Sequence, residues 1–338
     1  MVKPGRRNLI TDVPGVLIGN AADEATRSGV TVILPTRPAT VGVDVRGGAP
    51  GTRETPALDP NCLVAEAHAI VLAGGSVFGL AAADAVAAAL SARGIGLALT
   101  PRAVPVVPAA ILYDLGNGGD KEWGEAPPYA GLGRQALAAA GEVFSLGNAG
   151  AGFGAIAGAL KGGLGSASAD CGDGFIVGAL IAVNSFGSVT TGGPSDALMA
   201  APFEQGGEFG ALPALALPRN GQGVSMTPDL AKAALPAANT TIGVVATNAR
   251  LTKAEAERLA IMAHDGLARA IRPVHTPFDG DTLFALATGE RELGDNRPLA
   301  LTRLGAVAAD CVARAVAHGV LAATTLGDAK AYREVFFK

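Results

Sequence analysis

The chain has 338 residues, 49% of them hydrophobic and 17% charged, a composition that argues against a disordered protein. Its 26 Lys and Arg and 30 Asp and Glu leave a net charge of −4, so neither nucleic acid nor an anionic membrane is an expected partner. The 47 glycines follow no collagen period, and together with few aromatic residues they favour closely packed layers joined by tight turns.

Short apolar strands alternate with alanine-rich helical segments in the first half of the chain. We predict a buried strand at residues 69–73, a tight turn at Gly74-Gly75-Ser76 and a helix over residues 78–92. A second buried strand is predicted at residues 176–183, and it ends at Asn184. This alternation indicates an α/β or α+β protein built from layers of helix and sheet.

The clearest predicted helix spans residues 253–271. Thr252 and Glu255 form a capping box at its start, and apolar residues recur behind it at helical spacing. Strand patterns at residues 241–246 and 283–288 flank this helix. A strand, a helix and a second strand in succession are typical of layered α/β structure.

Two stretches rich in glycine and proline, residues 116–133 and 206–238, are predicted to be linkers. Neither is of low complexity, and no internal repeat is present. We therefore expect residues 1–338 to form a single domain. The second linker ends directly before Asn239 and Thr240.

The best candidate for a membrane span is the uncharged run over residues 69–83, which is too short and is broken by a turn. The basic residues 1–7 are followed by no apolar segment of the kind that a signal peptide requires. Cys62, Cys171 and Cys311 lie far apart and cannot all pair. These features favour a reduced, cytoplasmic protein without a membrane partner.

The glycine-rich segment Gly147–Gly154 resembles a dinucleotide-binding loop only loosely. No Gly-Lys-Ser/Thr follows it, and the acidic residues found about 20 positions later, Asp170 and Asp173, lie in another glycine cluster. Close packing of the backbone, or an anion-binding turn, is the better interpretation.

Other familiar catalytic patterns fail as well. No serine stands in Gly-x-Ser-x-Gly or three residues before a lysine. The histidines are too scattered for a zinc motif, so neither a metal nor another cofactor is expected; they are His68, His264, His275 and His318. A structural role is expected for His264, whereas His275 stands close to an acidic turn and is a candidate for a supporting role in a site.

Polar residues interrupt the apolar chain at four places that together suggest a catalytic site. Asn239-Thr240 precedes a predicted strand, Asp279 and Asp281 form an Asp-Gly-Asp turn, Lys161 lies in a glycine-rich segment and Asn184 ends a buried strand. If the bond before Thr240 breaks, that residue gains an α-amine, with a reference pKa of about 7.7–8.0, that can accept the proton of its own hydroxyl.

Each of these residues also has an ordinary structural interpretation. Threonines are common at the start of a strand, Asp-Gly-Asp is a frequent tight turn, and a lysine among glycines is usually solvated. Chemistry and spacing alone leave both interpretations open.

Segments spread from residue 9 to about residue 288 resemble the DmpA/BapA-like autoprocessing aminopeptidase family, which includes the nylon-oligomer hydrolase NylC. The order and span of these segments carry the resemblance; they are Leu9–Gly19, Val45–Gly48, Leu72–Leu80, Ile111–Asp114, Gly147–Gly154, Asn239–Ile242 and His275–Phe284. Well-known aminopeptidase members use a serine nucleophile and a Ser/Glu pair. Thr240 and the Asp279/Asp281 pair are closer to NylC.

The resemblance implies a four-layer αββα sandwich, similar to that of ornithine acetyltransferases, and a homotetramer. It places one self-cleavage between Asn239 and Thr240, with Thr240 as the nucleophile. It assigns the remaining catalytic positions to Lys161, Asn184, Asp279 and Asp281, and a substrate-lining role to Gly74, Gly75, Ser76 and Tyr113.

The expected function is therefore a metal-free hydrolase of amino-acyl amides, small peptides or ω-amino-acid oligomers that acts through an acyl-enzyme. Asn184 would stabilise the oxyanion, and Lys161 would tune the amine of Thr240. Two alternatives are an acetyltransferase on the same fold and a non-catalytic binding protein that never cuts itself.

Overall fold

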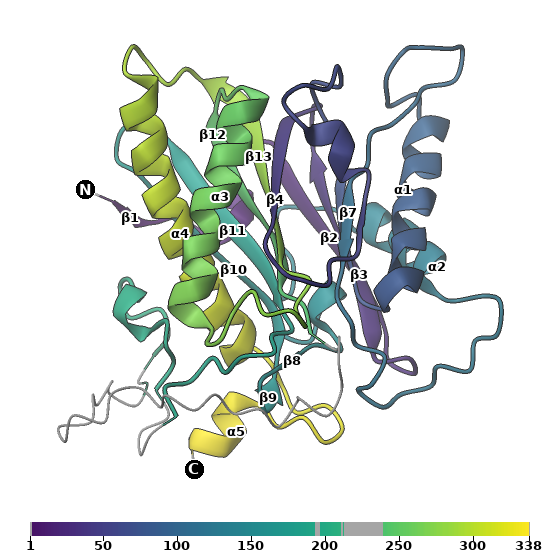
Figure 1. The fold of residues 1–338 in the computed structure, drawn as a ribbon, viewed down its shortest axis with the longest axis vertical. Coiled ribbons are helices and arrows are strands. Elements are labelled where there is room, and N and C mark those ends of the chain that lie inside the picture. Colours follow the sequence, from purple (N-terminus) through teal and green to yellow (C-terminus); the bar gives the residue numbers. More distant parts are fainter. Residues whose placement is uncertain (1, 193–196, 211, 213–238, 338) are drawn as a thin grey trace.

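The computed structural model describes residues 2–192, 197–210, 212 and 239–337, which form two β-sheets covered by helices (Figure 1). The larger sheet has the strand order β1 (Lys3–Pro4), β10 (Gly163–Asp170), β11 (Ile176–Val183), β12 (Ile242–Ala249), β13 (Thr282–Arg291) and β4 (Thr40–Val45). The smaller sheet has the order β2 (Val16–Asp23), β3 (Ser28–Pro35), β6 (Ile70–Ala73), β7 (Ala109–Ile111) and β5 (Thr52–Arg53). A short ribbon joins β8 (Ile156–Ala157) to β9 (Leu160–Lys161).

Helices cover the outer face of each sheet. The larger sheet packs against α3 (Lys253–Ala270) and α4 (Arg297–Leu321), and the smaller one against α1 (Ala81–Ala92) and α2 (Tyr129–Ala138). Helix α5 (Tyr332–Phe336) follows α4, and short 3-10 turns complete the chain at η1 (Ile10–Asp12), η2 (Thr55–Leu58), η3 (Ser76–Leu80), η4 (Gly150–Gly152) and η5 (Ala201–Phe203). The order helix, sheet, sheet, helix confirms the expected four-layer αββα sandwich (Figure 1).

Alternation of side chains along the strands produces these layers. In β12, Val245 belongs to the core beneath α3 and α4, whereas Val244 belongs to the core between the two sheets. In β6, Leu72 lies between the sheets and Val71 lies beneath α1 and α2. Because successive strand residues face opposite sides, apolar runs such as these bury both faces of a sheet.

The abundant glycines allow the layers to approach closely. A Cβ on Gly165 of β10 would lie 1.9 Å from the carbonyl oxygen of Ala315 in α4. The glycine-rich segment 147–154 packs in the same manner, since a Cβ on Gly152 would lie 2.0 Å from the backbone nitrogen of Leu164. This segment therefore brings its backbone against β10.

The predicted elements around the catalytic candidates agree with the structure. Strand β11 has the predicted bounds, and α3 ends one residue before the prediction. Thr252 caps α3 by accepting a hydrogen bond from the Glu255 backbone N–H, and the Glu255 carboxylate accepts one from the Thr252 N–H in return. Strand β12 begins one residue later than predicted and both β12 and β13 end later than predicted, because the two strands pair with each other as far as Ala249 and Arg291.

Two predictions near α1 and α2 were partly wrong. The helix over residues 78–92 begins as the 3-10 turn η3 and becomes α-helical only at Ala81. The linker predicted at residues 116–133 runs into α2, because Tyr129 is buried and packs edge-on against Trp123, which in turn contacts Phe78. Most of the second predicted linker, residues 206–238, lies outside the described residues.

Among the described residues, one helix is long and apolar enough to cross a membrane by composition, and it is α4. The most apolar window of α4 is 78% buried within the fold, where it packs on β10 and β11. Core helices of this kind pass the same compositional test, so α4 is weak evidence for a membrane span.

The strand order of the larger sheet brings the end of β11 and the starts of β12 and β13 side by side at one end of the strands. Strand β12 begins at Ile242, opposite Ala182 near the end of the antiparallel strand β11. Strand β13 runs parallel to β12 and begins at Thr282, opposite Ile242. Three polar segments consequently lie together at this end of the sheet: Asn184 after β11, Thr240 before β12 and the acidic turn before β13.

Candidate active site

Five polar side chains that the sequence pointed to are buried in the fold. Lys161, Asn184, Thr240, Asp279 and Asp281 are each at most 3% exposed. Buried polar groups must find hydrogen-bond partners, and buried charges are costly unless they are compensated. The contacts of these residues therefore define how the site is built.

Thr240 is held at its backbone and at its hydroxyl. Its N–H donates to the main-chain carbonyl of Asn184 at 2.7 Å. Its Oγ1 donates to the carbonyl oxygen of Asn239, the group that the predicted self-cleavage attacks, and accepts a hydrogen bond from the Gly280 N–H at 3.1 Å. The hydroxyl thus lies next to the bond between Asn239 and Thr240, within a set of fixed donors and acceptors.

Asp281 connects the acidic turn to the backbone beside Thr240. Its Oδ1 accepts from the Thr241 N–H at 2.8 Å. Its Oδ2 accepts from the His275 N–H at 3.1 Å and lies 2.8 Å from His275 Nδ1. Both oxygens of the carboxylate are therefore engaged.

Asp279 is fixed by a different set of donors. One oxygen accepts from the backbone N–H and the hydroxyl of Thr276, at 3.0 and 2.6 Å, and the other from the Phe186 N–H at 3.2 Å. Burial, together with the nearby charge of Asp281, raises the pKa of Asp279 above its usual value. A carboxyl in this setting accepts a proton more readily than one in water.

Asn184 uses both ends of its side-chain amide. Oδ1 accepts from the Ile156 N–H at 2.9 Å, and Nδ2 donates to the Tyr113 carbonyl at 3.0 Å. An amide nitrogen carries two hydrogens, so the contact with Tyr113 accounts for one of them.

Lys161 is connected to the site through the backbone of the ribbon formed by β8 and β9. Its Nζ donates to the carbonyls of Gly162 at 2.8 Å and Gly152 at 3.2 Å. Burial lowers the pKa of Lys161 to about 7, and the negative charge of Asp114 opposes only part of that effect. Its strand β9 pairs with β8, which begins at Ile156, the residue that holds the amide of Asn184.

Of the residues predicted to line the substrate cleft, Gly74 and Gly75 lie against Asp114, whereas Tyr113 contacts Asn184 through its carbonyl. The Gly75 N–H donates to Asp114 Oδ1, and the Ser28 hydroxyl donates to Oδ2, both at 2.7 Å. Burial raises the pKa of Asp114 to about 6 despite these hydrogen bonds. Ser76 donates its N–H to Leu112, close to Tyr113 in the chain. A substrate-lining role for Gly74, Gly75, Ser76 and Tyr113 stays a prediction.

Sequence reasoning missed the segment that holds the acidic turn from the other side. The backbone N–H groups of Arg46 and Ala49 donate to the carbonyls of Asp281 and Asp279, at 2.9 and 2.8 Å. Gly47 lies between them, and a Cβ there would lie 2.3 Å from both the Asp279 carbonyl oxygen and the Asp281 nitrogen. In the sequence, the Gly47-Gly48 pair shortly after β4 could have indicated this contact.

Two of the histidines that looked scattered in the sequence are neighbours in the fold. The rings of His264 and His275 lie 4.9 Å apart in an edge-to-face arrangement. His264 Nε2 is 3.0 Å from the carbonyl oxygen of Asp44, which agrees with the structural role expected for this residue, and burial lowers its pKa to about 4. The described parts of the chain contain no group of three side chains that could hold a metal ion.

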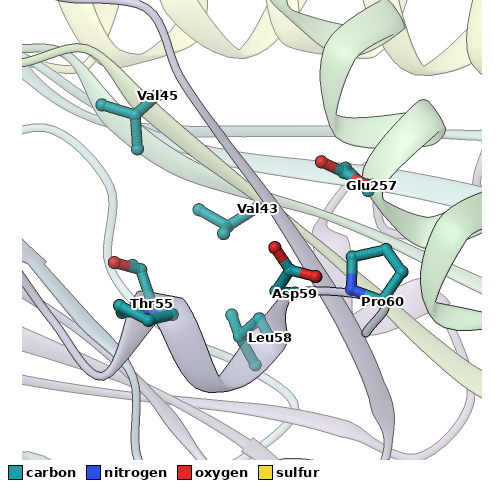
Figure 2. Close-up of a pocket in the computed structure, with 8 residues that line it drawn as sticks. Val43, Val45, Thr55, Leu58, Asp59, Pro60 and Glu257 are labelled. Carbon is teal, nitrogen blue, oxygen red and sulfur yellow. The ribbon is translucent and has the colours of Figure 1, made fainter. Parts of the chain in front are cut away.

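A surface hollow beside β4 and α3 is separate from this set of residues (Figure 2). The hollow contains none of the five catalytic candidates; its lining residues are Val43, Val45, Thr55, Pro56, Leu58, Asp59, Pro60 and Glu257. It combines aliphatic side chains with two carboxylates and carries no nucleophile beyond the hydroxyl of Thr55.

The four-layer αββα sandwich is the fold of N-terminal nucleophile hydrolases, and in this chain the buried Thr240 lies two residues before its central strand β12. The family model for peptidase family S58 matches residues 8–333, so the chain belongs to peptidase family S58. It is accordingly a hydrolase of peptide or amide bonds.

Relatives agree with this assignment. The chain is 46% identical to an uncharacterized aminopeptidase of Mycobacterium tuberculosis, with 97% of this chain and 98% of the relative covered. It is 34% identical to a 6-aminohexanoate-oligomer endohydrolase of Kocuria sp., with 92% of this chain and 86% of the relative covered. The nylon-oligomer hydrolase resemblance is thereby confirmed.

Solved structures agree on the fold. A beta-aminopeptidase of Burkholderia sp. superimposes with a TM-score of 0.69 at 25% identity, over 96% of this chain and 89% of that one. The L-aminopeptidase D-Ala-esterase/amidase of Ochrobactrum anthropi, described as a variant of the Ntn hydrolase fold, gives 0.70 at 23% identity, over 95% and 87% of the two chains. The fold itself is common to hydrolases and acetyltransferases, so the family model and the named relatives are what favour the hydrolase.

Proposed function

We propose that Thr240 cuts the chain once, at its own amino side, and then serves as the nucleophile of an amide hydrolase. The observation that carries this proposal is the contact of Thr240 Oγ1 with the Asn239 carbonyl, inside a buried site where the Gly280 N–H also reaches the hydroxyl. A side-chain oxygen already beside the carbonyl needs little movement to attack it.

The self-cleavage proceeds through an ester. Thr240 Oγ1 attacks the carbonyl carbon of Asn239, its proton passes to the departing Thr240 nitrogen, and the peptide bond becomes an ester bond between the two residues. Water then hydrolyses the ester and releases the Asn239 carboxylate. The products are the pieces 1–239 and 240–338, with a free α-amine on Thr240.

The freed amine then acts as the base for substrate hydrolysis. The Asn184 carbonyl, which holds the Thr240 nitrogen at 2.7 Å, keeps that amine beside its own hydroxyl. The second amide hydrogen of Asn184 stabilises the tetrahedral oxyanion, and the cationic form of Lys161, which is linked to Asn184 through β9 and β8, supports that charge. Asp279 and Asp281 orient the backbone around Thr240 and take part in proton transfer.

The substrates are short amides with an amino end, such as amino-acyl amides, small peptides or ω-amino-acid oligomers. The relatives support this range, since they include an uncharacterized aminopeptidase and a 6-aminohexanoate-oligomer endohydrolase. Assaying an α-amino-acyl amide, a β-amino-acyl amide and a 6-aminohexanoate oligomer side by side ranks the three chemistries.

The deciding experiment compares intact masses of denatured wild type, Thr240→Ala and Thr240→Ser. Wild type and the serine variant should separate into pieces 1–239 and 240–338, because both keep a side-chain hydroxyl. The alanine variant should stay at 33.4 kDa and lose at least about a thousandfold in amide hydrolysis. Cleavage of the alanine variant at the same bond would overturn the proposal.

The functional unit is a cytoplasmic homotetramer of cut chains. Support for a reducing location comes from the cysteines, all three of which are free, with Cys171 and Cys311 buried. The tetramer rests on the family resemblance. Light scattering on the purified enzyme should give four times the mass of one chain, and a single-chain mass would refute the tetramer.

A further inference from the structure

His275 has no role in the mechanism above, although it contacts Asp281 twice. Its ring Nδ1 and its backbone N–H both reach Asp281 Oδ2, at 2.8 and 3.1 Å. The other oxygen of Asp281 accepts the N–H of Thr241, the neighbour of the nucleophile. His275 therefore holds one side of a carboxylate whose other side touches the nucleophile's strand.

The backbone of His275 is in an unusual conformation. Its φ of +57° lies in the left-handed region, which residues other than glycine seldom adopt and in which Asn, Asp and His are enriched. In this conformation, the backbone N–H and the ring nitrogen both reach a single carboxylate oxygen. Strained residues of this kind persist where the surroundings determine them, often at functional sites.

Neighbouring groups fix the position of the imidazole. The ring packs edge-to-face on His264, which is buried and bonded to the backbone of β4 through Asp44. The next residue, Thr276, holds Asp279 by its N–H and hydroxyl. Residues 275 and 276 thus hold both carboxylates of the turn whose central residue, Gly280, donates its N–H to Thr240 Oγ1.

We propose that His275 is a positioning residue for the reaction of Thr240. By binding Asp281 Oδ2 through Nδ1, it directs Oδ1 to the Thr241 N–H and keeps the Gly280 N–H aimed at the hydroxyl. This inference rests on the proposed function of Thr240.

His275→Asn and His275→Gly form a matched pair of tests. Asparagine places an amide N–H near the position of Nδ1 and accepts a positive φ, whereas glycine accepts that φ but lacks a side-chain donor. In hydrolysis of a fixed amino-acyl amide, the asparagine variant should keep at least a third of the wild-type kcat. The glycine variant should lose at least tenfold in kcat, with KM changed less than threefold.

A third variant guards against misfolding of the second. Should His275→Gly fail to give a cooperative thermal transition, His275→Asp replaces it, because aspartate also accepts a positive φ and its carboxylate offers no N–H to Asp281. The aspartate variant should then show the tenfold loss that asparagine avoids.

Either of two results would overturn the positioning role. Equal losses in the asparagine and donor-free variants would show that the Nδ1 contact is not what matters, and full activity in all of them would show that His275 is dispensable. Intact-mass analysis of the wild type separates the two proposals. A wild type uncut at Asn239–Thr240 refutes the role of Thr240 itself, whereas a normally cut wild type with unaffected variants refutes only the role of His275.

Discussion

Lys161 shows at the residue scale how burial changes the chemistry of a side chain. Its amine has no exposed surface and donates to two main-chain carbonyls, and burial lowers its pKa to about 7. A lysine in water is almost wholly charged at neutral pH, whereas this one is divided between its charged and neutral forms. It can therefore give or take a proton in the range where enzymes work.

This shift predicts how Lys161→Met changes stability with pH. Because the folded-state pKa is below the unfolded one, the lysine destabilises the fold progressively as the pH falls from about 10 to about 7, and by a constant amount below that. Relative to wild type, the methionine variant should gain several kcal/mol in free energy of unfolding at pH 7 and less than about 1 kcal/mol at pH 10. Urea unfolding at the two pH values measures the difference.

The same variant separates stability from catalysis. We expect Lys161→Met to cut itself at least about a hundredfold more slowly than wild type, since an electrostatic contribution to the transition state is lost. Time courses of intact mass measure that rate. A variant that is destabilised at pH 7, or that cuts at the normal rate, would contradict the roles given to this lysine.

At the scale of elements, the acidic turn before β13 is shaped by the segment that follows β4. Backbone hydrogen bonds from Arg46 and Ala49 hold the turn, and Gly47 fits between them with no room for a side chain. The two segments are more than 200 residues apart in sequence. The position of the Gly280 N–H therefore depends on a strand at the edge of the sheet.

Gly47→Ala should disturb this contact, and Gly131→Ala provides its control. The added methyl at position 47 meets backbone atoms at 2.3 Å, so we expect a loss of about 2–4 kcal/mol in stability and at least tenfold slower self-cleavage. Gly131 lies in α2 with open space around its Cβ position, and alanine there should stabilise by about 0.5–1 kcal/mol. Thermal unfolding and intact mass test both variants, and equal behaviour of the two would contradict the prediction.

The strands around Thr240 could be predicted from sequence because their signals are local. β11 is an unbroken apolar run that ends at Asn184, and α3 carries its own capping box. The pairing of β13 with β4 could not be predicted, since no local pattern specifies a partner so distant in the chain. The contact of His275 with Asp281 could not be predicted either. It depends on a positive φ at His275, which a histidine can adopt but which its presence in the sequence does not specify.

At the scale of the whole molecule, the proposed cut would separate two pieces that remain thoroughly interleaved. Strands β12 and β13 of the small piece lie between β11 and β4 of the large piece. A second connection is made by Arg314 of α4, which is fully buried and pairs with Glu208 at 2.6 Å. Burial alone would raise the pKa of Glu208, but hydrogen bonds from Arg314 and His318 outweigh it and lower that pKa to about 2.

Glu208→Gln should weaken the association of the two pieces. Because it leaves a buried guanidinium without its counter-charge, we expect a loss of about 3 kcal/mol at pH 7 in urea unfolding of the cut protein. Asp310→Asn is the matched control: it breaks the half-exposed pair with Arg269, and it should cost less than about 1 kcal/mol. Comparable losses in the two variants would show that the pair of Glu208 and Arg314 contributes no more to the association of the two pieces than a surface ion pair does.

Since the pKa of Glu208 is lowered, the contribution of Glu208 to the free energy of unfolding should disappear as the pH falls from about 4.5 to about 2.

The interleaved order of the larger sheet has a consequence for how long the enzyme lasts. In the uncut chain all strands of the larger sheet are covalently joined, so unfolding and refolding are intramolecular and independent of concentration. Once cut as proposed, the two pieces of an unfolded molecule would diffuse apart, and re-forming the sheet would become a second-order reaction that slows with dilution. The lifetime of a cut enzyme would then be set by the rate at which β12 leaves its place between β11 and β13, and not by the equilibrium free energy of unfolding.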